Sequence, residues 1–370
     1  MGTPTQYYVD PAIAGNSGAG SVGDPYGDIQ HALDTITRDA TNGDQINIKA
    51  GTDELLAAAL SLATYGTPSV SAPLVFRGYT AAANDGGIGG ISGQGSVSVF
   101  YSTTLVAIHF WDMHLHNTGA NIVVRVDDFC TFWNCEIDNS SATGGIRADQ
   151  YSNVINCYIH NVAGVACWIG TYGQVAGCFI EYGANVPSDG ILGTLAGCGT
   201  YNNIIKCSGA MDGIEAQAAG WYIANNSIWS NGGTGKGIHD EGLDRIGMVI
   251  INNIVEGFIG VGGVGISFGT GSEGLILHSN ALYNNTLNLN NLTDLSIADN
   301  NDVLGASPFT DPSTNDFTIN GTQAGVTEDA FPAAFKGAAS TTSLAEKGAS
   351  QAGAGAGGGM LKAEKRGGKQ

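Results

Sequence analysis

The chain has 370 residues, with 14 basic and 33 acidic side chains and a formal net charge of −19. An acidic body of this kind repels nucleic-acid phosphates, which excludes nucleic acid as a partner. No stretch of about 18 apolar residues is present, so no segment is predicted to span a membrane.

Residues 1–42 are predicted to form an N-terminal strand and a capping helix. The strand is expected at YYVDPA and the helix over residues 28–39. Such a helix would cover the unpaired strand edges at the open end of a solenoid. The opening residues contain neither a basic region nor an apolar stretch, so no secretion signal is predicted. The apolar face of the helix consists of Ile29, Ala32, Leu33 and Ile36.

Residues 43–300 are predicted to form the main domain. Strands are expected at 43–51 and 73–79, with a short helix or an irregular insertion at 53–63. A repeat of 21 to 27 residues then follows. Aliphatic residues recur at one position of the repeat, namely Leu115, Ile137, Ile159, Ile180, Ile205, Ile228, Val255 and Leu282. A second series lies two residues earlier, namely Met113, Cys135, Cys157, Cys178, Asn203, Asn226, Asn253 and Asn280.

Within each copy apolar and polar residues alternate, as in FWNCEID over residues 132–138. A period of two is that of a strand. A second element begins with Gly-Ile or Gly-Val 8 to 12 residues later, which leaves no room for a helix. Strands that recur in this way pair with their copies in register, about 4.8 Å apart. The pattern predicts an all-β fold, a right-handed single-stranded parallel β-helix of about ten coils. A large β-sandwich is the alternative.

The seven cysteines show no CxxC spacing, which argues against a structural zinc site. Three of them, Cys135, Cys157 and Cys178, belong to the inward series. Without a secretion signal they are predicted to be reduced thiols that pack in the core.

Residues 301–335 depart from the repeat and are predicted to form a C-terminal cap. Residues 336–370 are rich in Gly, Ala and Ser and carry 6 basic and 2 acidic side chains, against 8 and 31 in the preceding part. This tail is predicted to be a flexible tether that docks on an acidic neighbouring subunit; the alternative is a disordered solubilising end. The residues expected to dock are Met360, Leu361, Lys362, Lys365 and Arg366.

The opening QYYVDPA, the helix followed by GDQINIKAG and FRGY, and the recurring N-C/N-x-I coils resemble the pectate-lyase-like superfamily of parallel β-helices. The resemblance covers roughly residues 6–320. The closing SPFTDPSTNDFTIN is similar to the cap of β-helix proteins of tailed-phage virions, such as decoration, fibre and tailspike proteins. The superfamily includes polysaccharide lyases, glycoside hydrolases and non-catalytic virion proteins. The resemblance therefore implies the fold and leaves the activity open.

Outward residues of the early coils point to a metal site. His116, Asp138 and His160 are predicted to form one column, and two imidazoles with a carboxylate suit a divalent transition metal. The alternative is a set of cross-strand charge pairs on a solvated or subunit-facing sheet. A divalent metal is the one cofactor that the sequence suggests, and none is required.

A catalytic site is predicted, as an alternative, on the sheet that begins with Gly-Ile. Glu215 and Glu241 lie one coil and two residues apart, roughly 8 Å by strand geometry, which suits an inverting glycosidase. Arg245 and Lys236 lie nearby, where they can bind acidic sugars or act as the base of a lyase. Polygalacturonase-like signatures are absent. The alternative to a catalytic site is an ordinary solvated polar face of the sheet. The first outward column is predicted to contain Arg147, Leu192, Glu215, His239 and Ser267.

Aromatic residues of the middle coils are predicted to cluster at the surface, as a subunit interface or a sugar-binding face. Some of them are expected to belong to the core instead. The set consists of Trp168, Tyr172, Tyr182, Tyr222 and Trp229.

These features favour a non-enzymatic structural component of a tailed-phage virion, a rigid β-helix displayed on the capsid or tail and tethered by its C-terminal tail. Its expected partners are other virion proteins, copies of itself and a host-surface polysaccharide. Its expected location is the virion. A tailspike-like polysaccharide lyase or glycoside hydrolase and a carbohydrate-binding adhesin are the alternatives.

Overall fold

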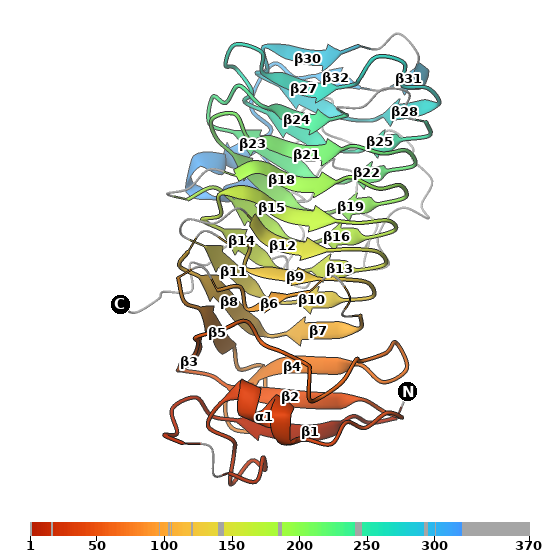
Figure 1. Cartoon of the computed structure of the whole chain (residues 1–370). Coiled ribbons are helices and arrows are strands. Elements are labelled where there is room, and N and C mark those ends of the chain that lie inside the picture. The colour runs from red at the N-terminus through yellow and green to blue at the C-terminus, as the bar shows by residue number, and fades with distance from the viewer. Residues whose placement is uncertain are drawn as a thin grey trace. The chain divides into compact units, whose positions relative to one another are not determined.

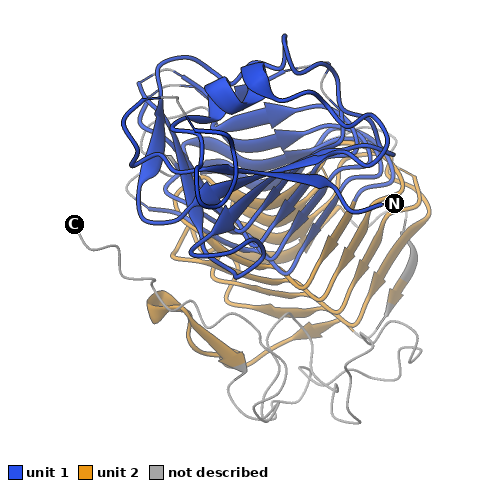
Figure 2. Ribbon diagram, turned by 90° about the horizontal axis from the view of Figure 1, so that it is seen from below, with its two compact units in different colours: residues 1–198 blue, residues 199–370 orange. Residues whose placement is uncertain are grey.

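The computed structural model describes residues 2–15, 18–95, 97–102, 104, 106–119, 121–139, 144–183, 187–240, 246–291, 295–299 and 301–319. The chain divides into two compact units, unit 1 up to Cys198 and unit 2 from Gly199 (Figure 2). Each unit is built from three parallel sheets whose strands recur once per coil (Figure 1). The predicted parallel β-helix is therefore confirmed. No helix among the described residues is long and apolar enough to cross a membrane.

In unit 1, strands of successive coils pair in parallel in each of three sheets. The first sheet consists of β1 (Thr5–Val9), β2 (Asp44–Lys49), β4 (Leu74–Tyr79), β7 (Ile108–Trp111), β10 (Thr131–Trp133), β13 (Asn153–Ile155) and β16 (Gln174–Ala176). The second consists of β3 (Asp53–Leu56), β5 (Gly89–Gly93), β8 (Met113–Asn117), β11 (Glu136–Asn139), β14 (Tyr158–His160) and β17 (Phe179–Glu181). The third consists of β6 (Phe100–Tyr101), β9 (Val124–Val126), β12 (Gly144–Ala148), β15 (Gly164–Ile169) and β18 (Pro187–Gly193).

Columns of like side chains fill the interior of unit 1. The aliphatic column of the second sheet starts one coil earlier than predicted, at Ile91, and its members are fully buried. Removal of each such side chain from water contributes about 2 kcal/mol before chain entropy is counted. Consecutive pairing is observed for Ile91, Leu115, Ile137, Ile159 and Ile180. The predicted columns are thus confirmed in this unit.

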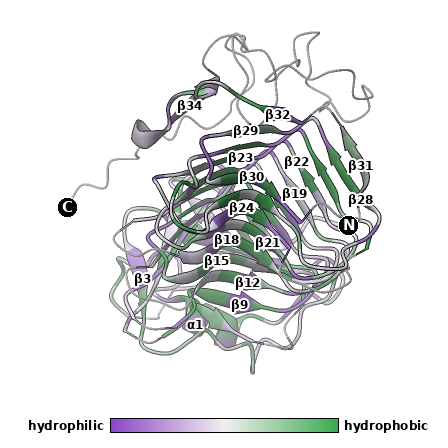
Figure 3. Ribbon diagram, turned by 90° about the horizontal axis from the view of Figure 1, so that it is seen from above, coloured by the Kyte–Doolittle hydropathy of each residue, from purple (hydrophilic) through white to green (hydrophobic). Residues whose placement is uncertain are grey.

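Unit 2 repeats the arrangement. Its first sheet consists of β19 (Gly199–Tyr201), β22 (Tyr222–Ala224), β25 (Val249–Ile251), β28 (Leu275–His278) and β31 (Leu295–Asp299). The second consists of β20 (Ile204–Cys207), β23 (Ser227–Ser230), β26 (Ile254–Glu256), β29 (Ala281–Tyr283) and β32 (Asp302–Val303). The third consists of β21 (Asp212–Ala216), β24 (Lys236–His239), β27 (Val264–Ser267) and β30 (Leu287–Asn290). Figure 3 colours these strands by hydropathy, and β28 is largely hydrophobic.

A ladder of inward asparagines runs through unit 2. Each Nδ2 donates to the Oδ1 atom of the next asparagine, at 2.9 to 3.0 Å. Each accepting Oδ1 also binds a backbone N–H of the preceding coil, so buried polar atoms are paired along the ladder. In unit 1 the same position is held by Met113 and three cysteines, whose thiols donate to backbone carbonyls. The ladder consists of Asn203, Asn226, Asn253, Asn280 and Asn301.

All seven cysteines are buried and outside any disulfide, as predicted for core thiols. Burial raises the pKa of Cys130 to about 12, and that of Cys198 likewise to about 12. The thiols of Cys130 and Cys198 therefore stay protonated and unreactive near neutral pH in the folded chain.

Two predicted elements differ from those observed. The helix α1 spans Ile29–Thr35 rather than residues 28–39, with Asp28 as its N-cap. It ends at Thr35 because the next residue, Ile36, has an extended backbone, with φ −66° and ψ 137°. The segment predicted as a helix or insertion at 53–63 begins instead with strand β3. Within the predicted cap, β33 (Phe309–Asp311), a 3₁₀ turn (Pro312–Thr314) and β34 (Asp316–Ile319) form an antiparallel pair.

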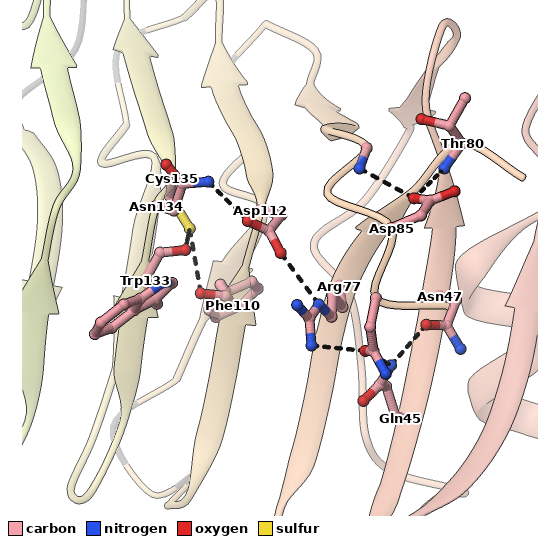
Figure 4. Close-up of polar contacts among 12 residues, drawn as sticks. Gln45, Asn47, Arg77, Thr80, Asp85, Phe110, Asp112, Trp133, Asn134 and Cys135 are labelled. Carbon is pink, nitrogen blue, oxygen red and sulfur yellow. Dashed lines mark hydrogen bonds and ion pairs between the residues drawn. The ribbon is translucent and has the colours of Figure 1, made fainter. Parts of the chain in front are cut away.

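Left-handed residues form the corner between the first and second sheets of unit 1. Asp112, Asn134 and Asn156 have φ values of 55°, 52° and 53°. Short Asx side chains tolerate this conformation because they can bond locally. Figure 4 shows Asp112 accepting from Nδ2 of Asn134 at 2.7 Å and from Nε of Arg77 at 3.1 Å. Arg77 also donates to Oδ1 of Asn84 at 2.6 Å, so its charge and donors are used within the fold.

Candidate functional site

A strip of arginine and aromatic side chains follows the outer face of the third sheet of unit 1. Strand pairing places Tyr101, Arg125, Arg147 and Trp168 at equivalent positions of four consecutive coils. We call these four residues the arginine strip. Leu192 follows Trp168 in the same column, as the sequence pattern predicted for Arg147 and Leu192. The rise of about 4.8 Å per coil sets the separation of the two arginine backbones.

Ring contacts hold both guanidinium groups of the strip. The Cζ atom of Arg147 lies 3.8 Å from the ring centroid of Trp168, and that of Arg125 lies 5.3 Å from the ring centroid of Tyr101. Cation–π contacts of this kind orient a planar guanidinium while leaving its edge donors available. Arg125 also donates from Nη1 to the Tyr101 hydroxyl at 3.1 Å.

The strip has more hydrogen-bond donors than the fold uses. The Nε atoms of both Arg125 and Arg147 are buried and have no hydrogen-bond partner among the described residues. The nearest carboxylate to Arg147 is that of Asp149, at 3.9 Å from Nε, which is an ion pair but too long for a hydrogen bond. Arg77 is the counter-example in the same unit, because Asp112 and Asn84 occupy its donors (Figure 4).

Two carboxyl groups follow the strip arginines by two residues. Asp127 comes directly after β9 and Asp149 directly after β12, on neighbouring coils. Burial raises the pKa of Asp127, and the charges of Asp128 and Asp149 raise it further. A carboxyl group with a raised pKa adds less negative charge beside the arginines, and both carboxyls can bind sugar hydroxyls.

The predicted metal column is present in register, but its donor atoms do not converge. Asp138 pairs with His116 on one side and with His160 on the other. Nδ1 of His160 lies 3.9 Å from Oδ1 of Asp138 and its Nε2 lies 3.1 Å from Glu136, but His116 turns away toward Asp53 and Ser92. The shortest contacts of the two imidazoles are to Glu136 and Ser92, which lie outside the predicted column. Burial lowers the pKa of His116, with His114 as the second cause.

The aromatic residues predicted to cluster are spread over different positions. In unit 1, Trp168 lies in the third sheet, Tyr172 in the turn after it, and Tyr182 just after the second-sheet strand β17. Tyr172 ends an exposed stack with Tyr151 and Phe129, with ring centroids 5.3 and 5.0 Å apart. In unit 2, Trp229 is buried, as expected for a core residue. The spread follows from the coil, in which residues a few positions apart can belong to different sheets.

Three members of the predicted first outward column lie in unit 2. Glu215, His239 and Ser267 pair consecutively in the third sheet, and Glu215 is buried. The notable group beside it is Lys236, whose Nζ lies 2.7 Å from Nε2 of His239. The same Nζ lies 3.2 Å from Nδ1 of His239, which is itself 3.1 Å from Oδ2 of Asp212, so the amine, the imidazole and the carboxylate form one cluster.

Several predicted site residues lie outside the described part of the chain. These are Glu241 and Arg245 of the catalytic proposal, and Met360, Leu361, Lys362, Lys365 and Arg366 of the tail. The roles predicted for them stay predictions.

Comparison with known proteins supports the fold. No protein-family model matches the chain, and no curated protein matches its sequence. The chain has the fold of pectate-lyase-like parallel β-helices. The structure of pectate lyase Pel9A aligns over 95% of this chain and 97% of its own, with a TM-score of 0.66 and 16% identity. Likeness at this identity shows the fold alone.

Two further structures are similar at a lower level and carry no argument about this chain. One is the pectin methylesterase from Aspergillus niger, with a TM-score of 0.39 and 13% identity over 83% of this chain and 93% of its own. The other is the A-module of the Azotobacter vinelandii mannuronan C-5 epimerase AlgE6, with a TM-score of 0.37 and 11% identity over 76% and 96%.

Proposed function

We propose that the protein binds an acidic polysaccharide along the arginine strip. The observation that carries this proposal is the pair of guanidinium groups on adjacent coils, held by Tyr101 and Trp168, with the Arg147 side chain 26% exposed to solvent. Neither arginine is held by a carboxylate of the described residues at hydrogen-bond distance, so an anion outside the sheet competes with no strong internal partner for the exposed part of each guanidinium group. Guanidinium groups match carboxylates in a bidentate geometry.

The surroundings favour a sugar polymer over a single small anion. The two arginines recur at the coil repeat, so they can meet successive charges of a chain that runs along the sheet. Asp127 and Asp149 lie beside them and can accept hydrogen bonds from hydroxyl groups. Aromatic side chains at both ends of the strip offer the ring edges and faces that sugars contact. The acidic body of the protein disfavours nucleic acid at the same surface.

Replacement of Arg147 or Arg125 by alanine is expected to weaken binding of polygalacturonate about 10- to 100-fold each. The reason is that each change removes charge-assisted hydrogen bonds worth about 1.5–3 kcal/mol. Binding is measured by affinity electrophoresis and calorimetry at low and high salt, with neutral dextran and single-stranded DNA as comparison polymers.

Lys49→Ala is the matched control, because it removes one positive charge of unit 1 at a place where Asp10 already pairs with it. This variant should bind polygalacturonate as the unchanged protein does. Equal retention of all three variants, or equal binding of dextran, would contradict the proposal. Stronger binding of DNA than of polygalacturonate would show that the ligand of the arginine strip is a polyanion other than an acidic polysaccharide.

Cleavage of the polymer is a second candidate function, favoured by the cluster of Asp212, His239 and Lys236 in unit 2. A lysine amine held by an imidazole can take a proton from carbon next to a uronate carboxyl group, the first step of an elimination. Lys236→Arg keeps the charge but removes the base. We expect this change to abolish the release of unsaturated sugar ends, detected by their ultraviolet absorbance, and to leave binding at the strip intact.

If the unchanged protein releases no product from a panel of acidic polysaccharides, the cleavage candidate fails and the binding proposal stands by itself. A structural role on a tailed-phage virion stays a prediction. It depends on residues 336–370, which lie outside the described residues. Display of a glycan-binding β-helix on a particle is compatible with both ideas, and detection of the chain in purified particles would test it.

A further inference from the structure

Three side chains on the second sheet of unit 1 bring donor atoms to one point. Asp53 belongs to β3, and His114 and His116 belong to β8. One donor atom of each lies within 4.8 Å of the other two. Oδ2 of Asp53 lies 3.9 Å from Nδ1 of His114 and 3.8 Å from Nδ1 of His116. These separations exceed hydrogen-bond length and approach the roughly 3.4 Å between two ligands of one tetrahedral ion with bonds of about 2.1 Å.

A glycine opens the path between the carboxylate and the histidines. Strand β5 lies between β3 and β8, and Gly90 pairs with Asp53 on one side and with His114 on the other. A Cβ atom at Gly90 would lie 1.6 Å from Oδ1 of Asp53. The Asp53 carboxylate therefore occupies the space that any other residue would fill, and it extends across β5 toward β8.

Ser92 holds the ring of His116 in a suitable orientation. Ser92 pairs with His116 in register, and its Oγ lies 2.5 Å from Nε2. With Ser92 as the acceptor, Nε2 carries the proton and Nδ1 directs its lone pair toward the carboxylate of Asp53. Two lone-pair atoms that face each other at this distance repel, and a cation between them removes the repulsion. Histidine ligands of metals generally have such an outer partner on the second ring nitrogen.

We infer that Asp53, His114 and His116 bind a divalent transition-metal ion, with zinc as the representative case. Two imidazoles and a carboxylate form a ligand set typical of such ions, and three protein ligands leave a position for water or an incoming group. The three side chains are between 23% and 35% exposed, so solvent can reach the ion. The site lies on a different sheet from the arginine strip and does not depend on polysaccharide binding.

The test is a calorimetric titration of the full-length chain with Zn²⁺ after removal of metal by a chelator. We expect one bound ion per chain. His114→Ala and His116→Ala should each weaken binding by at least about 100-fold. Ser92→Ala should weaken it about 10- to 100-fold, the usual effect of losing an outer partner. Co²⁺ bound by the unchanged chain should show the visible absorption of nitrogen and oxygen ligands, and this band should disappear in His116→Ala.

His160→Ala is the matched control, since it removes an imidazole from the same sheet two coils away from His116 and should leave the affinity unchanged. Thermal melting without metal checks the fold of every variant, and Ser92→Ala keeps the test decisive if a histidine variant does not fold. The inference is overturned if the unchanged chain binds no more Zn²⁺ than the His114→Ala/His116→Ala double variant. It is also overturned if His160→Ala loses the ion and His114→Ala keeps it.

Discussion

Replacement of Asn253 by leucine is expected to lower the free energy of unfolding by about 3–5 kcal/mol. The Asn253 side chain is fully buried, and its Nδ2 donates to the carbonyls of Ile223 and Ile251, each at 3.0 Å. Its Oδ1 accepts from the backbone N–H of Asn226 at 2.9 Å. Leucine has a similar volume but leaves these buried groups without partners, at about 1–3 kcal/mol each. Urea denaturation followed by circular dichroism measures the loss.

Asn231→Leu is the control for this experiment, because Asn231 is an exposed residue of the same unit. Its effect should stay within about 0.5 kcal/mol. A loss at Asn253 no larger than that at Asn231 would mean that the asparagine ladder does not hold the coils of unit 2 together.

Replacement of Gly78 by alanine should destabilise unit 1 by about 3 kcal/mol, at the upper end of the usual cost of overpacking. A Cβ atom at Gly78 would lie 2.2 Å from the carbonyl oxygens of Asp112 and Gly87 and 2.3 Å from the amide nitrogen of Gly89. All three are backbone atoms, so relief requires β4 to move away from the corner residue Asp112. The midpoint of thermal unfolding reports the effect.

Gly23→Ala provides the comparison, since no atom of the described residues lies within 4 Å of the position that its Cβ would occupy. That variant should melt with the unchanged protein. An unchanged midpoint for Gly78→Ala would show that the corner between the first two sheets is looser than the contacts imply.

The inward columns could be predicted because in-register parallel pairing places like residues at equal positions of every repeat. Leu115, Ile137 and Ile159 can therefore be assigned to one column from the amino-acid sequence alone. The register of the third sheet was predicted less well in one coil. Val165 lies opposite Gly144, not opposite Ile146, and the pairing shifts at Gly164/Val165 near the next coil. Because of this irregular register, Trp168 was not predicted to belong to the outward column that contains Arg147.

The candidate sites were harder to predict because outward side chains choose partners that the repeat does not specify. His116 stands in its predicted column, yet its ring faces Asp53, which belongs to a segment that carries no repeat signal. The role of Gly90 could not be predicted either, because a residue without a side chain adds nothing to the pattern of apolar and polar residues. In the arginine strip, Tyr101 and Arg125 belong to short strands of two and three residues, too brief for alternation to be recognised.

The uneven length of the repeat, 21 to 27 residues, has a consequence for how such a chain can evolve. The strands of the second sheet stay in register within each unit although the number of residues per coil changes, so for this sheet the surplus is absorbed at the bends. Insertions there can grow new loops without displacing a residue on any flat face. Loops at the bends and residues on the sheets can therefore change independently during evolution. A sheet surface that binds one ligand can gain a new flanking loop through a single insertion.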